Sequence, residues 1–280
     1  MKTIFATLAL SATLAVPLSA SAQVSASGTL NNFSYTLVDL LPNDGIAPSL
    51  SIVKPGYPHP QGTTAYGDFR QSGPEQVQEI DKDRTRSLYS RPLDVNIAVP
   101  GTTVASTVSG TDFQSLDLRA DASTTRLAGH GRTAIASSSM MIEEFVLSPG
   151  TQVKFFADVN ASVARSIKST ELMAESSKVM ASMGFDGLLS SWYPNSSTEF
   201  KFSISDDSGL SYSTSERLWI MFDNTAATAY NLKLSIGLWS EVNALDNTPA
   251  TSPVPEPATY GMMLAGLALV AGMARRKRAG

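Results

Sequence analysis

The amino-acid sequence predicts an all-β fold, an antiparallel β-sandwich with either jelly-roll or immunoglobulin-like topology. Short β-favouring runs alternate apolar and polar residues, so each predicted strand has one face for a core and one for water. Turn residues, chiefly Gly, Pro, Asn and Ser, separate these runs at short intervals. The 280-residue chain contains no cysteine, so its hydrophobic core has to hold the sandwich without disulfides.

The N-terminal part of the sandwich is predicted to begin with a hairpin. Residues 24–30 and 33–41 favour strands, and Asn31-Asn32 between them is a turn signal. The segment 55–92 is poor in large apolar residues and rich in Pro, Gly, Gln, Asp and Arg, which predicts a long loop or an inserted arm.

The later strands are predicted more clearly, because the alternation is regular and the turns are well marked. Expected strands cover residues 93–99, 102–109, 132–140, 142–147 and 152–164, and further alternating runs lie at 200–204, 218–222 and 232–238. Residues 169–182 fit a strand and a helix equally well, since Leu172 and Val179 form a loose helical stripe that serines crowd.

Residues 1–22 have the organisation of a signal peptide. Lys2 is the positive region, residues 4–16 are apolar, and Ala20-Ser21-Ala22 places small residues where a signal peptidase reads them. The two alanines, Ala20 and Ala22, define the cleavage site, and the mature chain is expected to begin at Gln23. The sandwich domain is then expected over residues 23–246.

The C-terminal residues 254–280 combine a polar motif, an apolar run and a basic end. Val254-Pro255-Glu256-Pro257 precedes the uncharged residues 258–274, and Arg275-Arg276-Lys277-Arg278 follows them. At about 1.5 Å per residue the apolar run spans roughly 25 Å, enough for one transmembrane helix with slight adaptation of the bilayer. The cations would stay in the cytoplasm and leave the bulk of the chain outside it. Residues 247–253 are rich in Pro, Ser and Thr and are expected to form a linker.

These terminal features resemble the PEP-CTERM sorting signal of Gram-negative bacteria. Pro255-Glu256-Pro257 matches the core of that motif, and Arg275-Arg276-Lys277-Arg278 matches its basic end. The resemblance implies that a membrane-embedded exosortase, with a presumed cysteine nucleophile, recognises the signal and removes or exchanges it. It also implies a transient inner-membrane anchor, delivery to the cell surface or extracellular matrix, and association with exopolysaccharide or biofilm. A released and a re-anchored mature form are both compatible with it.

The charge of the chain argues against nucleic acid as a partner. Five of the 21 Lys and Arg and one of the 25 acids lie in the terminal segments, so residues 23–253 carry 16 cations, 24 acids and a net charge of −8. Nucleic-acid binding requires the opposite sign. An acidic surface suits an exported protein among polysaccharides and cations.

The sequence contains no pattern that predicts catalysis, a cofactor or a metal site. His59 and His130 stand between Pro and Gly neighbours, without a nucleophile motif. The pairs Glu143-Glu144 and Asp206-Asp207 would point to opposite faces of a strand rather than converge as glycosidase carboxylates do. Asp81-Lys82-Asp83 lacks the ligand pattern of a calcium loop. We therefore expect a protein that is not an enzyme.

Aromatic residues are the main candidates for binding. Trp192-Tyr193 lies in a predicted loop, where its rings could stack against the apolar face of a sugar. Trp219 has the opposite parity to Leu218 and Ile220, so it faces outward or fills a second core. The sequence thus favours an exported surface or matrix protein of unknown ligand. A carbohydrate-binding module and a hydrolase with an unrecognised acidic site are the alternatives.

Overall fold

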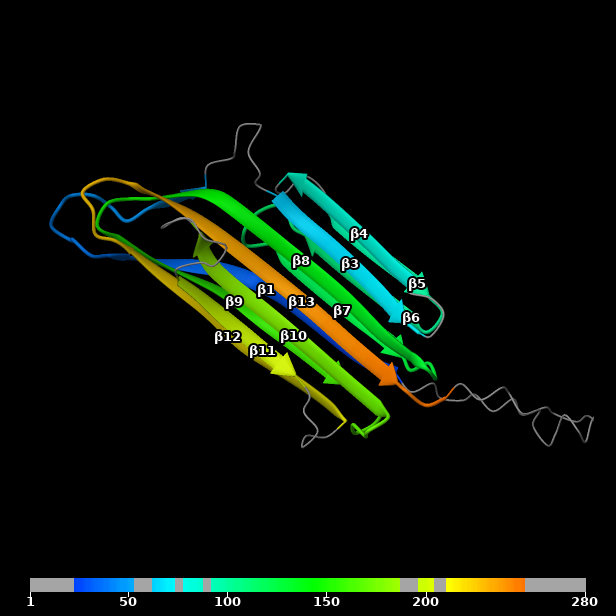
Figure 1. Ribbon diagram of the computed structural model, residues 1–280. Coiled ribbons are helices and arrows are strands. Elements are labelled where there is room, and N and C mark those ends of the chain that lie inside the picture. The colour runs from blue at the N-terminus through cyan, green and yellow to red at the C-terminus, as the bar shows by residue number, and fades with distance from the viewer. Residues whose placement is uncertain are drawn as a thin grey trace, which may run out of the picture.

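The computed structural model describes residues 23–52, 62–73, 78–87, 92–186, 196–203 and 210–249, and these residues form strands and their connections (Figure 1). In chain order the strands are β1 (Gln23–Asp39), β2 (Leu50–Ile52), β3 (Gly62–Ser72), β4 (Gln78–Ser87), β5 (Leu93–Val99), β6 (Thr102–Ser109), β7 (Asp117–Thr125), β8 (His130–Leu147), β9 (Thr151–Ala164), β10 (Met173–Asp186), β11 (Ser196–Ser203), β12 (Ser211–Asn224) and β13 (Tyr230–Asp246). Among the described residues no helix is long and apolar enough to cross a membrane.

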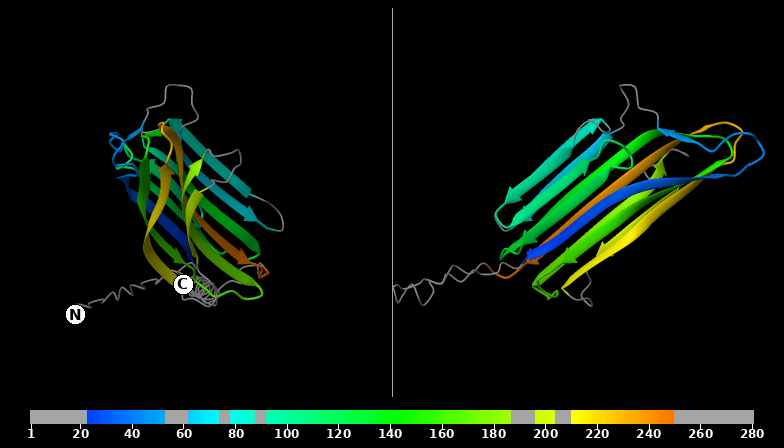
Figure 2. Two further views of the ribbon diagram at one scale, coloured as in Figure 1. Left: turned by 90° about the vertical axis from the view of Figure 1, so that its left-hand side faces the viewer. Right: turned by 180° about the vertical axis from the view of Figure 1, so that it is seen from behind.

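The strands build two antiparallel sheets that stack face to face (Figures 1 and 2). The six-stranded sheet has the order β12-β9-β1-β7-β6-β5, and the seven-stranded sheet has the order β11-β10-β13-β8-β3-β4 with β2 beside β8. Edge strand β4 contacts β5 and edge strand β11 contacts β12, so the edges of the two sheets lie over one another. This arrangement confirms the all-β, sandwich-like fold. The predicted signal peptide and transmembrane helix lie outside the described residues.

Alternation along the strands builds the core. In β13 the residues Leu232, Leu234, Ile236 and Leu238 are at most 2% exposed, while the residues between them face outward. Strands β5 and β6 occupy the predicted residues 93–99 and 102–109. The period-two pattern therefore located both the strands and their buried faces.

The interior has an aromatic half and a half of small residues. Phe155 is fully buried, with its ring centroid 5.1 Å from that of Phe145 and 5.6 Å from that of Phe113. In the other half the sheets approach closely, because a Cβ on Gly28 would lie 2.8 Å from Val179 Cγ1. Aromatic rings fill the wide end of the core, and glycine and alanine permit the close approach at the other end.

The predicted hairpin at the N-terminus is wrong, because residues 23–39 form one strand. β1 pairs with β9 on both sides of a register shift between Asn31 and Ser34. Asn32 has a φ of 53°, in the left-handed region that asparagine tolerates better than most residues. The two asparagines therefore form a β-bulge within the strand instead of a turn between two strands.

The long loop or arm predicted over 55–92 is also wrong, because this segment contains the hairpin of β3 and β4. Ala65 and Phe69 are buried in its inner face. A Cβ on Gly67 would lie 3.1 Å from both Val95 and Val104, across the sandwich. The inner face of β3 is made largely of small residues because the opposite sheet comes so close. The segment therefore lacks most of the large apolar residues on which the sequence prediction depended.

Two further ambiguities are resolved. The helix alternative for residues 169–182 is wrong, because Met173–Asp186 is strand β10. The two strands expected at 132–140 and 142–147 are one strand, β8, which pairs with β13 along its length. The pairing of β8 with β13 shifts its register between Leu232 and Leu234. A β-bulge of this kind interrupts the apolar–polar alternation, which is why the sequence suggested two strands.

Candidate functional site

Most residues predicted to carry function lie outside the described residues. These are Ala20 and Ala22 of the cleavage signal, the aromatic pair Trp192-Tyr193, the sorting motif Val254-Pro255-Glu256-Pro257 and the basic end Arg275-Arg276-Lys277-Arg278. Gln23, the expected first residue of the mature chain, is the first residue of β1. The expected start of the mature chain is therefore part of the described sandwich.

Both ends of the described sandwich lie at one pole. Gln23 at the start of β1 pairs with Thr125 at the end of β7, and Asp246 at the end of β13 pairs with His130 at the start of β8. A short connection joins Thr125 to His130, so these pairs are neighbours. Figure 2 shows the blue start of β1 beside the orange end of β13. We name this end of the sandwich the tail pole, because the chain leaves it toward residues 254–280.

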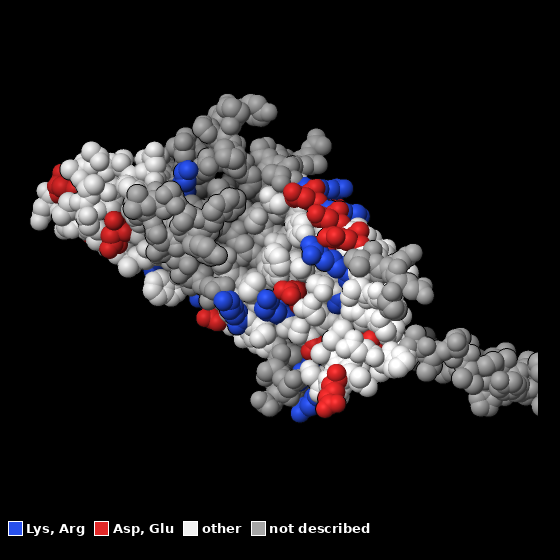
Figure 3. All heavy atoms as spheres, viewed as in Figure 1, with Lys and Arg blue, Asp and Glu red and all other residues white. Residues whose placement is uncertain are grey.

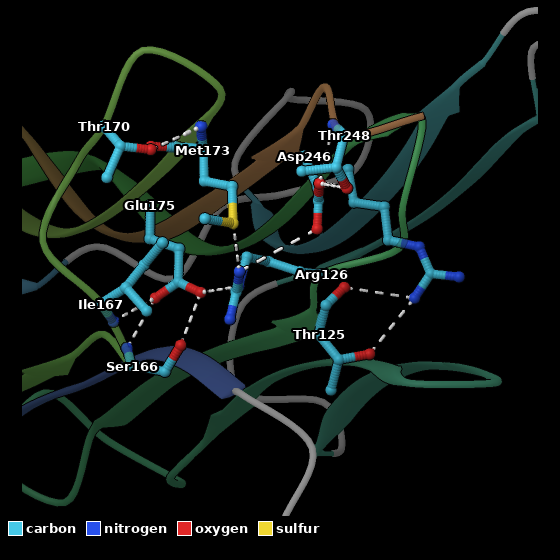
Figure 4. Close-up of polar contacts among 10 residues, drawn as sticks. Thr125, Arg126, Ser166, Ile167, Thr170, Met173, Glu175, Asp246 and Thr248 are labelled. Carbon is cyan, nitrogen blue, oxygen red and sulfur yellow. Dashed lines mark hydrogen bonds and ion pairs between the residues drawn. The ribbon is translucent and has the colours of Figure 1, made fainter. Parts of the chain in front are cut away.

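A buried ionic cluster lies at the tail pole (Figure 4). The Glu175 carboxylate is 0% exposed, and its Oε1 lies 2.9 Å from Nε of Arg126, although this ion pair lacks hydrogen-bond geometry. Glu175 also accepts hydrogen bonds from the backbone N–H of Ser166 at 2.6 Å and from its hydroxyl at 2.7 Å. The carboxylate is thus compensated by one cation and several donors, as burial of a charge requires.

The same arginine reaches the end of the last strand. Nη1 of Arg126 lies 3.9 Å from Oδ2 of Asp246 and donates a hydrogen bond to Sδ of Met173 at 2.8 Å. Asp246 Oδ1 in turn accepts hydrogen bonds from the backbone N–H and the hydroxyl of Thr248. The contacts of Arg126 therefore link β10 to the end of β13, from which the chain continues toward the C-terminal segment.

An exposed aromatic and cationic surface lies on the outer face of the six-stranded sheet. Trp219 of β12 is 51% exposed and stands opposite Phe156 of β9. Nζ of Lys154 lies 3.9 Å from the indole centroid and 5.2 Å from the centroid of Phe156. The outward alternative for Trp219 is confirmed. We name Lys154, Phe156, Arg217 and Trp219 the aromatic strip.

The charges of the aromatic strip are unequally compensated. Nε of Arg217 lies 3.6 Å from Oδ1 of Asp158, and Nη2 of Arg217 donates to the hydroxyl of Ser34 at 3.3 Å. Lys154 forms no ion pair with any residue in the part of the chain that the structure describes, and its ammonium group lies against the aromatic rings. A cation–π contact of this kind holds the ammonium in place without neutralising its charge.

A polar groove continues from the aromatic strip along the same strands. Its cavity has a volume of about 460 Å³ and is lined by Ser27, Thr29, Asn160, Ser162, Ser213 and Ser215, among others. Asn160 lies at its centre, donating to the Thr29 hydroxyl at 3.2 Å and accepting from the Ser215 hydroxyl at 2.7 Å. Hydroxyl and amide groups of this kind can exchange hydrogen bonds with another polyhydroxylated molecule.

The acidic and histidine candidates do not assemble into a site. Asp81 and Asp83 are exposed on β4, and within the described residues no group of three or more metal-binding side chains is present. Nδ1 of His130 bonds to the backbone carbonyl of Ala128 at 2.8 Å in the turn before β8. Glu143-Glu144 belongs to β8, but its side chains lie outside the description, as do His59 and Asp206-Asp207.

On the outer face of the seven-stranded sheet, the part formed by β3 and β4 carries mixed charges. Figure 3 shows acidic and basic side chains side by side over this hairpin. Asp68, whose side chain is 3% exposed, accepts a hydrogen bond from Nε of Arg70 at 3.0 Å, while its Oδ1 has no hydrogen-bond partner within the described part of the chain. Burial raises the pKa of the Asp68 carboxyl, and the attraction of Arg70 offsets this only in part.

The raised pKa of Asp68 predicts a pH effect on stability. An acid that binds its proton more tightly when folded makes the fold less stable as pH rises from its ordinary value, near 3.9, through the raised pKa. Asp68→Asn should therefore unfold at the same or a higher temperature than wild type at pH 7, with a smaller loss between pH 4 and 7. Thermal unfolding of the full chain in neutral detergent, followed by circular dichroism, measures this, with the exposed Asp83→Asn of the same strand as control. A lower midpoint for Asp68→Asn at pH 7 would show that the Arg70 pair outweighs burial.

Sequence reasoning missed two of these arrangements. Arg126, Glu175 and Asp246 come from a turn and two separate strands, and they carry no local signal. Phe156 had a usable signal, because it is a large apolar residue in the outward register between Lys154 and Asp158. Reading parity in β9 would have placed Phe156 on an outer face, although only the pairing of β12 with β9 puts it beside Trp219.

Comparison with known proteins places the C-terminal segment in a defined class of signal. Residues 253–278 match the PEP-CTERM protein-sorting motif. The chain therefore carries this motif at its C-terminus, which confirms the resemblance, and the motif supports export, transient membrane anchoring and processing by an exosortase. No curated protein and no solved structure matches the chain. The match covers the tail, so the sandwich domain has to be interpreted from its own structure.

Proposed function

We propose that this protein is a non-enzymatic component of the cell surface or extracellular matrix, delivered there by exosortase-dependent sorting and associated with exopolysaccharide or biofilm. The sorting motif over residues 253–278 is the observation that carries the proposal. The fold supports it in two ways. Gln23 of β1 and Asp246 of β13 lie at the same pole, and the ionic cluster holds the end of β13 there.

This architecture suits a domain that is tethered by one pole during export. The strands run along the length of the sandwich, so its far end and both outer faces lie away from the point of attachment (Figure 2). A trimmed or exchanged tail would leave the described sheets unchanged, because their last strand ends at Asp246. The sorting signal would thus be a segment that can be removed without a change in the sandwich domain.

Replacing Pro255-Glu256-Pro257 by three alanines should retain the protein in the inner membrane. The proline and glutamate residues are the part that matches the motif core, and the apolar run behind them is unchanged by the substitution. Fractionation of a Gram-negative host that has an exosortase measures the distribution of the full chain. We expect wild type in the surface and medium fractions, and the variant in the inner membrane with its tail intact.

The matched control replaces Thr251 and Ser252 by alanine, just ahead of the motif. This variant should distribute as wild type does, because the linker supplies only spacing. Equal distribution of the motif variant and wild type would refute exosortase-dependent sorting of this chain.

A carbohydrate-binding role is a second candidate, and the exposed Trp219 favours it. The aromatic pair Trp192-Tyr193, which the sequence favours for this role, is outside the described residues and remains a hypothesis. Trp219 with Phe156 offers an outward aromatic surface on two neighbouring strands. An outward surface of this kind is suited to stacking against a sugar ring.

A further inference from the structure

The aromatic strip and the polar groove form one continuous surface along β9 and β12. Figure 2, in the view from behind, shows the yellow β12 and the blue β1 on the face that carries it. We propose that this surface binds a chain of acidic sugars, with Trp219 as the stacking ring and Lys154 as the partner of a sugar carboxylate. The proposal rests on the proposed function and names the chemical class of the polysaccharide.

The exposure of the Trp219 indole favours a stacking role. Trp219 is 51% exposed although it belongs to a well-paired strand whose neighbours Leu218 and Ile220 are at most 4% exposed. An indole left half in water forgoes a large part of the free energy that its burial would provide. The apolar face of a sugar ring would cover it, while the hydroxyls at the edge of the sugar stay in water.

The charge of Lys154 favours an acidic sugar. Asp158 is paired with Arg217, and Asp223, also on this face, accepts a hydrogen bond from Gln152 at 2.8 Å. Lys154 thus remains as the cation without an acidic partner among the described residues, held 3.9 Å from the indole centroid. A carboxylate beside the stacked ring would pair with that ammonium. A polysaccharide carries neutral hydroxyls and an apolar ring face beside its carboxylates, which match the groove and the exposed indole, whereas nucleic acid requires a basic surface and residues 23–253 have a net charge of −8.

The length of the surface along β9 favours a polymer over a single sugar. The polar groove continues the line of the aromatic strip, because Asn160 and Ser162 follow Lys154 and Phe156 on the outer side of β9. At about 3.3 Å per residue, the distance from Lys154 to Ser162 is roughly 26 Å, which exceeds the length of a single sugar and accommodates several in a row. The hydroxyl and amide groups of the groove would bond the hydroxyls of the sugars beyond the stacked ring.

Retention in affinity electrophoresis through gels containing polygalacturonate tests this proposal, with dextran as the neutral polymer. The full chain in a neutral detergent should be retarded by polygalacturonate and much less by dextran. Trp219→Ala should bind about tenfold more weakly, which corresponds to about 1.4 kcal/mol and is within the range of an aromatic stacking contact. Lys154→Gln should lose affinity and most of its salt dependence, and Lys154→Arg should restore both.

The matched control is Trp239→Ala, which removes the same side chain from β13 on the opposite outer face. This variant should bind as wild type does. Equal retention of Trp219→Ala and wild type, or equal retardation by dextran and polygalacturonate, would overturn the proposal. So would a wild type that sediments as a dimer together with a Trp219→Ala variant that sediments as a monomer and is retained equally, because the strip would then be a contact between copies of the chain. None of these outcomes depends on tail processing, so they are separable from failure of the sorting proposal.

Discussion

Glu175→Ala is expected to lower the free energy of unfolding by about 3–5 kcal/mol, because the partly buried Arg126 guanidinium loses its nearer carboxylate and keeps only that of Asp246, at 3.9 Å. Glu175 is 0% exposed and the Arg126 side chain 18% exposed, so water replaces the lost partner only in part. The backbone N–H of Ser166 and of Ile167 would also lose their acceptor. Thermal unfolding of the full chain in neutral detergent should show a midpoint lower by roughly 10 °C.

The control for this prediction is Glu171→Ala, an exposed carboxylate a few residues earlier in the chain. Its effect should be within about 0.5 kcal/mol of zero. A double variant, Arg126→Met with Glu175→Gln, should cost less than the sum of the single variants, because it removes both charges together. Similar midpoints for Glu175→Ala and Glu171→Ala would mean that the cluster does not stabilise the tail pole.

Phe155→Ala is the second substitution with a large expected effect, about 3–5 kcal/mol of unfolding free energy. Phe155 is fully buried, and its ring lies between those of Phe145 and Phe185, at centroid distances of 5.1 and 6.0 Å. Both sheets contribute to this cluster, so a cavity here would weaken the contact between the two layers. Chemical denaturation followed by tryptophan fluorescence measures the loss.

Phe156→Ala provides the comparison, since it removes the same side chain one residue later on the outer face. Its effect on stability should be small, about 1 kcal/mol or less. The difference between neighbouring positions tests the register of β9 directly. If Phe156→Ala destabilised the fold as much as Phe155→Ala, the assignment of Phe155 to the inner face and Phe156 to the outer face would be contradicted.

The sequence predicted the fold wherever alternation used large side chains. Leu232 to Leu238 in β13 and residues 93–99 in β5 alternate clearly, and both are strands with the expected buried face. Prediction failed where the sheets come close together. In β3 the inner residues include Ala65 and Gly67, whose small size is dictated by the opposite sheet and leaves little apolar signal in the strand itself.

Local turn signals misled in a second way. Asn31-Asn32 has the composition of a hairpin turn, yet the residues on both sides pair with the same strand, β9. Pairing with a partner strand over 23–39 outweighs the local preference, and the left-handed conformation of Asn32 is absorbed as a bulge. The local sequence around Asn31-Asn32 does not show that the residues on both sides pair with the same strand.

The candidate site was predictable only in part. The sorting motif has a local, three-part pattern, so the signal that residues 253–278 match can be identified from the amino-acid sequence alone. Parity leaves Trp219 either outward or in a second core, and its exposure decides for the outward position. Its neighbours Lys154 and Phe156 are more than sixty residues earlier in the chain, and only the pairing of β12 with β9 brings them together.

The most direct test of exosortase-dependent delivery is the mass of the mature C-terminus, in cells with the exosortase and in cells without it. With the enzyme, mass spectrometry should find a chain that begins at Gln23 and lacks the apolar and basic residues after the Pro-Glu-Pro motif. Without it, the chain should keep its tail through Gly280. An identical C-terminus in both strains, whether trimmed or intact, would contradict exosortase-dependent delivery.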